Sequence, residues 1–325
     1  MVSAATIERA AETLASIISP TPLVRSKRLS KLYSAEIYLK REDLQEVRSY
    51  KIRGAYTLMS SFSPAERAHG VVCASAGNHA QGVAYSAAAL HIKTIIFMPV
   101  VTPQQKIDRV KYFGEDWVQI KLYGKTYDET CHRAKDFCKK QKMVFVHPFE
   151  DYTVMAGQGT VGKEIFDQME GNMDAIIVPI GGGGLASGLS TYIKHKSRAI
   201  QIYGAEPTGC AGMHCSLSKN EVTTLESIDT FADGVAVKTV GELTFPIVKR
   251  NIKKILLVSE QEICRTMIEM YQQDGIVTEP AGALSVAALT TMKKEIKGKT
   301  VVCIISGGNN DLARYPEIIR RSEGD

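Results

Sequence analysis

The feature of this sequence that most restricts its fold is the alternation of short apolar runs with longer amphipathic stretches. The short runs are rich in β-branched residues, which are typical of buried strands, and the stretches between them carry apolar residues at helical spacing. Strands that alternate with helices need crossover connections, and these connections produce parallel sheets covered by helices on both faces. The sequence therefore predicts an α/β protein.

Both sets of elements can be located along the chain. The predicted strands are Ile37–Leu39, Val71–Cys73, Thr94–Met98, Trp117–Ile120, Val144–Val146, Ala175–Pro179, Gln201–Gly204, Ile255–Val258 and Thr300–Ile305. The predicted helices include Asn78–Leu90, Gln104–Phe113, Thr126–Lys140, Gly159–Gln168, Leu185–Lys194, Gln261–Gln273 and Ala281–Lys294. These strands can form one large sheet or two sheets in separate lobes, because no repeat or linker marks a boundary.

Composition excludes several classes of protein. The 325 residues are 44% hydrophobic and 23% charged, as in ordinary globular proteins. The net charge of +5 comes from basic residues scattered among acidic ones, so we expect a mixed solvated surface and no nucleic-acid partner. The longest apolar runs, such as Ala175–Ile180, are too short to cross a bilayer, so we expect no membrane partner.

The 7 cysteines are odd in number and form no CxxC pair. This pattern is typical of a reducing compartment and indicates no metal site. The first residues, MVSAATIERAAETLASI, lack the basic start and apolar block of a secretion signal. We therefore predict a cytoplasmic protein without a metal.

Polar or glycine-rich segments follow three of the predicted strands. In open parallel sheets, ligands bind beyond the carboxyl ends of the strands, so these segments are candidate site loops. They are Ser75-Ala76-Gly77-Asn78-His79, Gly181-Gly182-Gly183-Gly184 and Ser306-Gly307-Gly308-Asn309.

The tetraglycine loop lies between a predicted strand and a predicted helix. Its backbone can turn several N–H groups toward an anion at the positive helix end, so a phosphate is the expected ligand. The alternative is a flexible turn. The loop is neither a Walker A loop nor a convincing dinucleotide fingerprint, because no GK[ST] follows it and no ribose-binding acid is in place.

The loop at 75–79 has two interpretations. Ser75 and Asn78 are residue types that cap helices, and that role is compatible with ligand binding. The small residues at 74–77 let a carboxylate approach the backbone. His79 is a candidate base, carboxylate ligand or packed core residue, and we favour the last two.

Lys51, in the segment Ser49-Tyr50-Lys51, is a further candidate site residue. A lysine is normally a surface charge. Only burial among apolar neighbours would lower its pKa and leave a neutral amine able to attack an aldehyde. The sequence alone does not show that burial.

Taken together, these segments resemble a known family. SYKIRGA (49–55), SAGNHAQG (75–82), GGGGL (181–185) and SGGN (306–309) are similar to the fold-type II pyridoxal-phosphate (PLP) enzymes, which have the tryptophan synthase β-like fold. Within them the chain resembles the branch of threonine dehydratases (threonine deaminases) and serine racemases. The resemblance runs from about Ile37 to Arg314 and includes AGQGT (156–160), ADG (232–234) and TEPAGA (278–283).

The resemblance implies a role for each site residue. Lys51 would bind PLP as a Schiff base and then act as the catalytic base at the substrate α-carbon. The expected cofactor-binding residues are Tyr50, Lys51, Asn78, Gly181, Gly182, Gly183, Gly184, Leu185, Gly234, Glu279, Ser306 and Gly307. The expected substrate-carboxylate residues are Ser75, Ala76, Gly77, Asn78 and His79.

The implied activity is dehydration and deamination of L-threonine and L-serine to 2-oxobutyrate and pyruvate, with release of ammonia. A serine racemase is the alternative, but racemases of this branch carry a serine where this chain has Ala76, which has nothing to titrate. Their metal site also has an acid after Glu-Pro, and none follows Glu206-Pro207 here. A non-enzymatic phosphate-binding module and a β-replacement enzyme are further alternatives.

The family's architecture implies two lobes. We expect a large PLP-binding lobe from 1–65 and 148–325, and a small inserted lobe at 66–147 that carries the carboxylate loop. The segment REDLQEVRSYK (41–51) resembles the biosynthetic dehydratases, which implies a role in isoleucine biosynthesis. We expect no C-terminal regulatory domain, hence no isoleucine inhibition, and a homo-oligomer, either a dimer or a tetramer.

Overall fold

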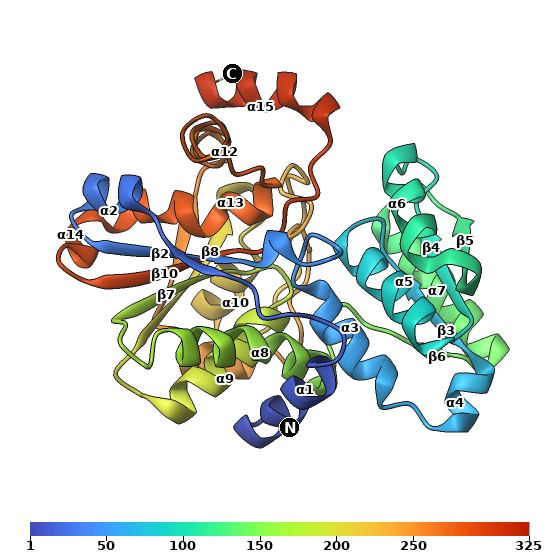
Figure 1. Ribbon diagram of the computed structural model, residues 1–325. Coiled ribbons are helices and arrows are strands. Elements are labelled where there is room, and N and C mark those ends of the chain that lie inside the picture. Colours follow the sequence, from blue (N-terminus) through green and yellow to red (C-terminus); the bar gives the residue numbers. More distant parts are fainter. Residues whose placement is uncertain (325) are drawn as a thin grey trace.

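The computed structural model describes residues 1–324 and contains two sheets with helices packed against them (Figure 1). The larger sheet is 6-stranded in the order β1-β2-β10-β7-β8-β9. All its neighbouring strands are parallel except β1, which runs antiparallel to β2. Its strands are β1 (Leu23–Arg25), β2 (Glu36–Arg41), β7 (Ala175–Pro179), β8 (Gln201–Pro207), β9 (Lys254–Val258) and β10 (Thr300–Ile305).

The smaller sheet is 4-stranded, parallel throughout, and ordered β5-β4-β3-β6. Figure 1 shows it beside the larger sheet, together with α5, α6 and α7. Its strands are β3 (Val71–Ala74), β4 (Thr94–Met98), β5 (Val118–Leu122) and β6 (Val144–Phe145).

Helices connect almost all successive strands, as the parallel pairing requires. The α-helices are α1 (Ala4–Leu14), α2 (Lys27–Tyr33), α3 (Lys51–Ser60), α4 (Pro64–His69), α5 (Asn78–Leu90), α6 (Gln104–Gly114), α7 (Tyr127–Gln141), α8 (Tyr152–Gln168), α9 (Gly184–Lys196), α10 (Gly212–Lys219), α11 (Phe245–Asn251), α12 (Glu260–Asp274), α13 (Pro280–Ala287), α14 (Lys293–Ile296) and α15 (Tyr315–Glu323). Short 3-10 turns include η1 (Glu42–Leu44), η2 (Glu115–Trp117) and η4 (Ala288–Met292).

Alternate residues of each central strand in the larger sheet enter different hydrophobic cores. Val302 and Ile304 of β10 pack in the core that contains α8, α9 and α11. Cys303 and Ile305 of the same strand pack in the core that contains α12 and α13. This period of two explains why β10 reads as a continuous apolar run, because helices cover both faces of its sheet.

Helix α3 lies between the two sheets. Its residues Ile52 and Met59 share a core with Val83 of α5 and with Ile96 of the smaller sheet. On its other side it meets α8 at a glycine: a Cβ at Gly157 would lie 2.5 Å from the Arg53 carbonyl oxygen. The backbone of α3 is therefore packed between α5 and α8, and the boundaries 66–147 for a small lobe stay a prediction.

The predicted strands are confirmed with small changes at their ends, and they form two sheets. Trp117 was wrongly placed in a strand and closes the turn η2 instead. The short strand β1 was missed, since its three residues carry no periodic signal.

Two helices also differ from the prediction. Helix α8 begins at Tyr152 rather than at 159, because the Asp151 carboxylate caps it by accepting from the N–H groups of Thr153 and Val154. The stretch 281–294 is divided into α13, η4 and α14. No helix among residues 1–324 is long and apolar enough to cross a membrane.

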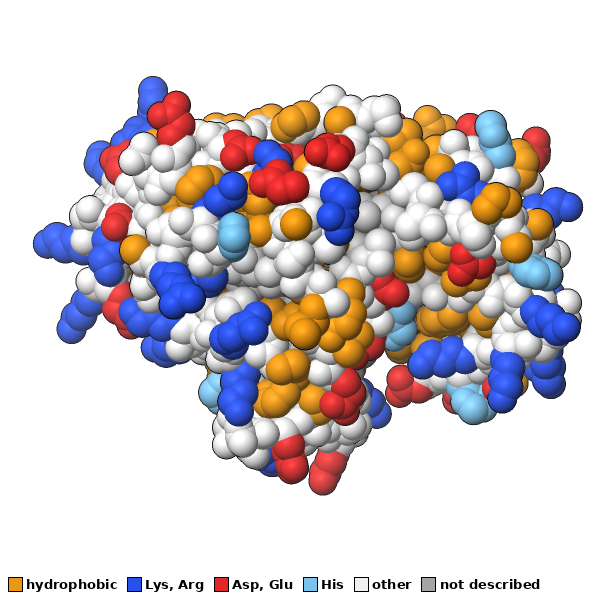
Figure 2. All heavy atoms as spheres, turned by 90° about the horizontal axis from the view of Figure 1, so that it is seen from below, with side chains coloured by type: hydrophobic (Ala, Val, Ile, Leu, Met, Phe, Trp, Pro, Cys, Tyr) orange, Lys and Arg blue, Asp and Glu red, His pale blue; other side chains and the backbone are white. Residues whose placement is uncertain are grey.

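Figure 2 shows basic and acidic side chains interspersed on the face of the molecule seen from below. On that face the charge does not gather into a single basic surface. This mixture agrees with the modest net charge of +5.

Candidate active site

The site begins where the loop after β10 meets the segment that leads into α3. Ser49 and Gly307 form an antiparallel bridge, and the Tyr50 N–H donates to the Ser306 carbonyl oxygen at 3.2 Å. The buried Ser306 hydroxyl donates to the Ala281 carbonyl oxygen at 3.2 Å. Lys51, the first residue of α3, therefore lies beside the carboxyl end of β10, as expected for residues of one site.

The Lys51 amine donates to the Pro148 carbonyl oxygen at 3.3 Å and lies 5.3 Å from the centre of the Tyr50 ring. The surrounding protein removes water from this amine and lowers the pKa of Lys51 to about 8, although the Glu279 carboxyl opposes the shift. A fraction of the amine is therefore neutral near neutral pH and can act as a nucleophile or base.

The tetraglycine loop joins β7 to α9. Among residues 1–324, the backbone N–H groups of Gly182, Gly183, Gly184 and Leu185 donate to no protein acceptor. Gly183 has a φ of 95°, in the region that favours glycine, and it directly precedes the helix. Unpaired N–H groups at a helix N-terminus form an anion site, so the loop suits a phosphate.

Close packing explains why the loop needs glycine. A Cβ at Gly182 would lie 2.4 Å from the Phe149 ring, and one at Gly184 would lie 2.9 Å from the Phe149 Cβ. The Thr244 hydroxyl donates to the Gly182 carbonyl oxygen at 2.6 Å and fixes the loop from the other side. The sequence did not predict a role for Phe149 or Thr244, because neither residue lies in one of the polar or glycine-rich loops that pointed to a ligand.

The loop at 75–79 leads from β3 into α5. The capping prediction for this loop was wrong: Gly77 occupies the N-cap position, and no side chain caps the helix. The Ser75 hydroxyl instead accepts from the Gly77 N–H at 3.1 Å. In the part of the chain that the structure describes, the N–H groups of Asn78 and His79 have no protein acceptor, so the start of α5 suits a second anion, such as a carboxylate.

His79 is buried and its Nε2 lies 2.9 Å from the Val146 carbonyl oxygen. Burial and the neighbouring Lys51 lower the pKa of His79 to about 3. The ring is therefore neutral, with Nε2–H donating to that carbonyl, and it is a packed residue rather than a proton carrier.

A chain of amides leads to a buried carboxyl group. Asn309 Nδ2 donates to Asn78 Oδ1 at 2.7 Å, and Asn78 Nδ2 donates to Glu279 Oε1 at 2.6 Å. Burial, followed by the negative charge of Asp233, raises the pKa of Glu279 to about 8. Glu279 is thus mainly protonated at neutral pH, and it can face an apolar ring without introducing a charge.

Two predicted glycines border this carboxyl group. A Cβ at Gly234 would lie 3.1 Å from Glu279 Oε1, and one at Gly307 would lie 2.4 Å from it. The space beside Glu279 therefore depends on both glycines. Together with Lys51 and the two helix N-termini, this arrangement suits a ligand that has a phosphate, an aldehyde and a flat ring.

Residues 14–307 match the family described as pyridoxal-phosphate dependent enzyme. The chain belongs to this family. Its site residues fit the cofactor, since the glycine loop offers unpaired N–H groups for a phosphate and Lys51 offers an amine with a lowered pKa. The expected fold-type II architecture is confirmed by this match and by the solved structures below.

Two curated relatives of this PLP-dependent enzyme carry the same name. It is 51% identical over 311 residues to L-threonine dehydratase biosynthetic IlvA of Halalkalibacterium halodurans, which covers 96% of this chain and 75% of that relative. It is 50% identical over 325 residues to the protein of the same name from Lactococcus lactis, covering 99% of this chain and 78% of the relative.

Solved structures of similar fold include a threonine deaminase and a serine racemase. The processed form of threonine deaminase isoform 2 from Solanum lycopersicum has a TM-score of 0.91 and 37% identity, covering 97% of this chain and 93% of that one. Maize serine racemase has a TM-score of 0.92 and 29% identity, covering 98% of this chain and 97% of that one. The expected resemblance to both branches is confirmed.

The Glu206 carboxylate is hydrogen-bonded to the backbone of this chain. Its carboxylate accepts from the N–H groups of Met213 and His214, each at 2.8 Å, at the start of α10. Burial raises the pKa of Glu206 to about 7. No group of three or more His, Cys, Asp or Glu side chains within residues 1–324 is arranged to hold a metal, and the absence of a metal site stays a prediction.

Proposed function

We propose that this PLP-dependent enzyme dehydrates and deaminates L-threonine, and also L-serine, to give 2-oxobutyrate or pyruvate together with ammonia. The observation that carries the proposal is the Lys51 amine, with its pKa lowered to about 8, in a chain 51% identical to a biosynthetic threonine dehydratase. The name of those relatives also supports a role in isoleucine biosynthesis.

The proposed roles follow the chemistry of each group. Gly181–Gly184 and Leu185 bind the cofactor phosphate, because unpaired N–H groups at a helix N-terminus favour an anion. Tyr50, Asn78, Gly234, Glu279, Ser306 and Gly307 line the ring. The loop before α5 and the first turn of that helix bind the substrate carboxylate through Ser75, Ala76, Gly77, Asn78 and His79.

When bound, PLP supplies an aldehyde that links to an amine and a conjugated ring that withdraws electrons from the substrate α-carbon. Lys51 Nζ removes the α-proton, and its lowered pKa makes it partly unprotonated at working pH. The α5 N-terminus holds the substrate carboxylate during this step. The electron pair left at the α-carbon forms the Cα–Cβ double bond as the β-hydroxyl takes up a proton and departs as water, so that the α-proton and the hydroxyl leave together as one water. A second water then hydrolyses the released enamine to the 2-oxo acid and ammonia.

Two residues favour elimination over inversion. Ala76 lies in the loop before α5 and has no side-chain group that can donate or accept a proton, so Lys51 is the proposed single proton carrier at the α-carbon. Ser306 offers a neutral hydroxyl, which is too weak an acid to protonate a pyridine nitrogen, so the ring stabilises a carbanion less and prompt loss of the hydroxyl is favoured.

Serine racemization is the second candidate, because maize serine racemase shares the fold at a TM-score of 0.92. Chiral analysis of serine recovered after incubation separates the two activities. Recovery of substantial D-serine with little pyruvate would assign the enzyme to the racemases.

The decisive assay measures 2-oxobutyrate and pyruvate formation side by side in the holoenzyme. A visible cofactor absorption band that borohydride removes excludes a mere phosphate-binding module. Lys51→Ala is expected to lose both the band and turnover. Equal failure of the wild-type holoenzyme with threonine and serine would refute the dehydratase assignment.

We also propose that the enzyme is a cytoplasmic homo-oligomer. All seven cysteines, which lie within residues 1–324, are free thiols, and free thiols are typical of a reducing compartment. Light scattering coupled to size-exclusion chromatography tests the oligomer: a monomer's mass would contradict it, and a dimer or tetramer would support it.

A further inference from the structure

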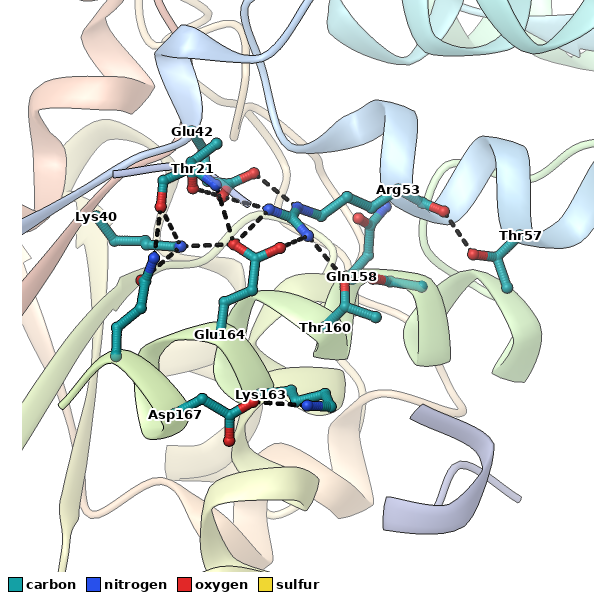
Figure 3. A network of polar contacts seen from close by, with 12 residues as sticks. Thr21, Lys40, Glu42, Arg53, Thr57, Gln158, Thr160, Lys163, Glu164 and Asp167 are labelled. Carbon is teal, nitrogen blue, oxygen red and sulfur yellow. Dashed lines mark hydrogen bonds and ion pairs between the residues drawn. The ribbon is translucent and has the colours of Figure 1, made fainter. Parts of the chain in front are cut away.

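A buried cluster of ion pairs includes Arg53 of helix α3, which follows Lys51 by two residues in the sequence (Figure 3). We name it the anchor cluster and define it by Lys40, Glu42, Arg53 and Glu164. Arg53 is only 1% exposed and Glu42 is fully buried. The cluster contains two cations and two carboxylates, so its net charge is zero when all four groups are ionised.

Arg53 uses all five of its N–H donors within the protein. Nε and Nη2 each donate to Glu42 at 2.8 Å, which is a bidentate pair. Nη1 and Nη2 donate to Glu164 at 2.6 and 3.0 Å, and Nη1 also donates to the Thr160 hydroxyl at 3.0 Å. A planar fork of this kind fixes direction as well as charge, which a lysine ammonium cannot do.

The second cation of the cluster makes a different connection. Lys40 Nζ, which is fully buried, donates to Glu164 at 2.6 Å, to the Thr21 carbonyl oxygen at 2.8 Å and to Gln168 at 2.9 Å. Lys40 thus joins β2 to α8 and makes no hydrogen bond to α3. Arg53 alone connects the cluster to α3.

The position of Arg53 on its helix shows which face of α3 the anchor cluster holds. Residues two apart in an α-helix point about 200° away from each other, so Arg53 fixes the face of α3 opposite to the one that carries Lys51. The same turn is held from the other side, because the Tyr50 N–H donates to the Ser306 carbonyl oxygen at 3.2 Å. The first turn of α3 is therefore held between the anchor cluster and the loop after β10.

We propose that Arg53 is a positioning residue that sets where Lys51 Nζ lies relative to the cofactor and the substrate α-carbon. The inference rests on the proposed role of Lys51. An electrostatic route is disfavoured, because burial lowers the pKa of Lys51 against the opposing charge of Glu279, and no member of the anchor cluster contributes to the shift. A misplacement of about 1 Å at a reacting group can reduce a rate by about 100-fold.

The test compares Arg53→Met with the matched control Lys40→Met. Each change removes one buried cation that pairs with Glu164 and leaves the cluster with one excess negative charge, so both should destabilise the fold. Arg53→Met should do so more strongly, because Glu42 also loses its bidentate partner. Each holoenzyme is measured for thermal midpoint, cofactor Kd, the pH midpoint of the visible cofactor band, and kcat and KM for threonine.

We expect Arg53→Met to lower kcat at least 100-fold and to shift the pH midpoint of the band. Lys40→Met should also lower the thermal midpoint but keep kcat within about threefold of wild type. Arg53→Lys retains the charge with three donors in place of five, so it should recover part of the rate. If Arg53→Met does not fold, the comparison of Arg53→Lys with Lys40→Met tests the proposal. We then expect a lowered kcat in Arg53→Lys and not in Lys40→Met.

The inference is overturned if the Arg53 variants lose no more kcat than Lys40→Met does and leave the pH midpoint of the cofactor band unchanged. The band and the cofactor Kd are read without turnover. A wild-type enzyme that binds the cofactor but forms neither 2-oxobutyrate nor pyruvate would therefore refute the proposed function, while the positioning of Lys51 would still be tested by these two readouts.

Discussion

Replacing Lys51 with methionine should abolish catalysis and at the same time stabilise the cofactor-free protein. The environment of Lys51 lowers its pKa from 10.5 to about 8. At about 1.4 kcal/mol per pKa unit, keeping this amine charged in the folded protein costs up to about 3 kcal/mol. Methionine fills a similar volume without a charge, so the cost disappears in the variant.

The pH dependence of the free energy of unfolding shows whether the charge of Lys51 causes the difference in stability. Between pH 8 and 10.5 the unfolded state binds more protons at this position, so the wild-type protein gains stability as pH rises. Lys51→Met should therefore be more stable by about 3 kcal/mol at pH 7, and this gap should shrink to about 1 kcal/mol at pH 10.

Urea unfolding of both proteins, freed of cofactor, measures this gap directly. Lys219→Met is the matched control, because Lys219 is exposed at the end of α10 and should give no pH-dependent gap. A gap for Lys51→Met that stays constant from pH 7 to pH 10 would refute the reasoning, since it would show that the charge of Lys51 is not desolvated.

Three further predictions concern the glycine loop, the α-carbon and an ion pair between the segment 66–147 and the rest of the chain. Gly183→Ala forces an L-residue to a φ of 95° with its Cβ 2.7 Å from the Thr244 hydroxyl, so the cofactor Kd, measured by equilibrium dialysis, should rise at least about tenfold. Unchanged affinity would mean that this loop does not bind the phosphate. Ala76→Ser adds a hydroxyl that can carry a proton, so chiral chromatography should detect D-serine formed from L-serine at a rate above that of wild type. No increase would show that position 76 does not face the α-carbon. Lys106 pairs with Asp233 at 2.6 Å, the only ion pair within residues 1–324 that joins the segment 66–147 to the rest of the chain. Since partly exposed pairs contribute up to about 1 kcal/mol, Lys106→Met should raise KM for threonine up to about fivefold, and 1 M NaCl should remove the difference from wild type. A difference that persists in high salt would contradict an electrostatic contact.

The sequence predicted well wherever a local pattern reflects a local cause. The run Thr300–Ile305 is apolar throughout because both faces of its strand are covered, and it is strand β10. Gly181–Gly184 suggested an anion site because only glycine allows such a turn, and the loop does present unpaired N–H groups. The prediction failed at Ser75 and Asn78, where capping chemistry was plausible but the Asn78 amide donates to Glu279 instead.

The residues that were missed are those whose role depends on distant partners. Phe149 packs on the glycine loop, and Thr244 hydrogen-bonds the Gly182 carbonyl oxygen, although neither residue belongs to a recognisable pattern. Arg53 stood within a motif, yet nothing nearby in the sequence indicated that Glu42 and Glu164 would enclose its guanidinium.

By itself, the sequence determined the α/β class, the order of most strands and helices, and the loops at the ends of β3, β7 and β10. These follow from hydrophobic periodicity and from the backbone freedom of glycine, which are properties of short segments. Only the tertiary structure decided that Lys51 is desolvated, that Glu279 has a raised pKa and that Arg53 is fully paired. Desolvation and ion pairing depend on which atoms replace water around a group, and those atoms come from segments far apart along the chain.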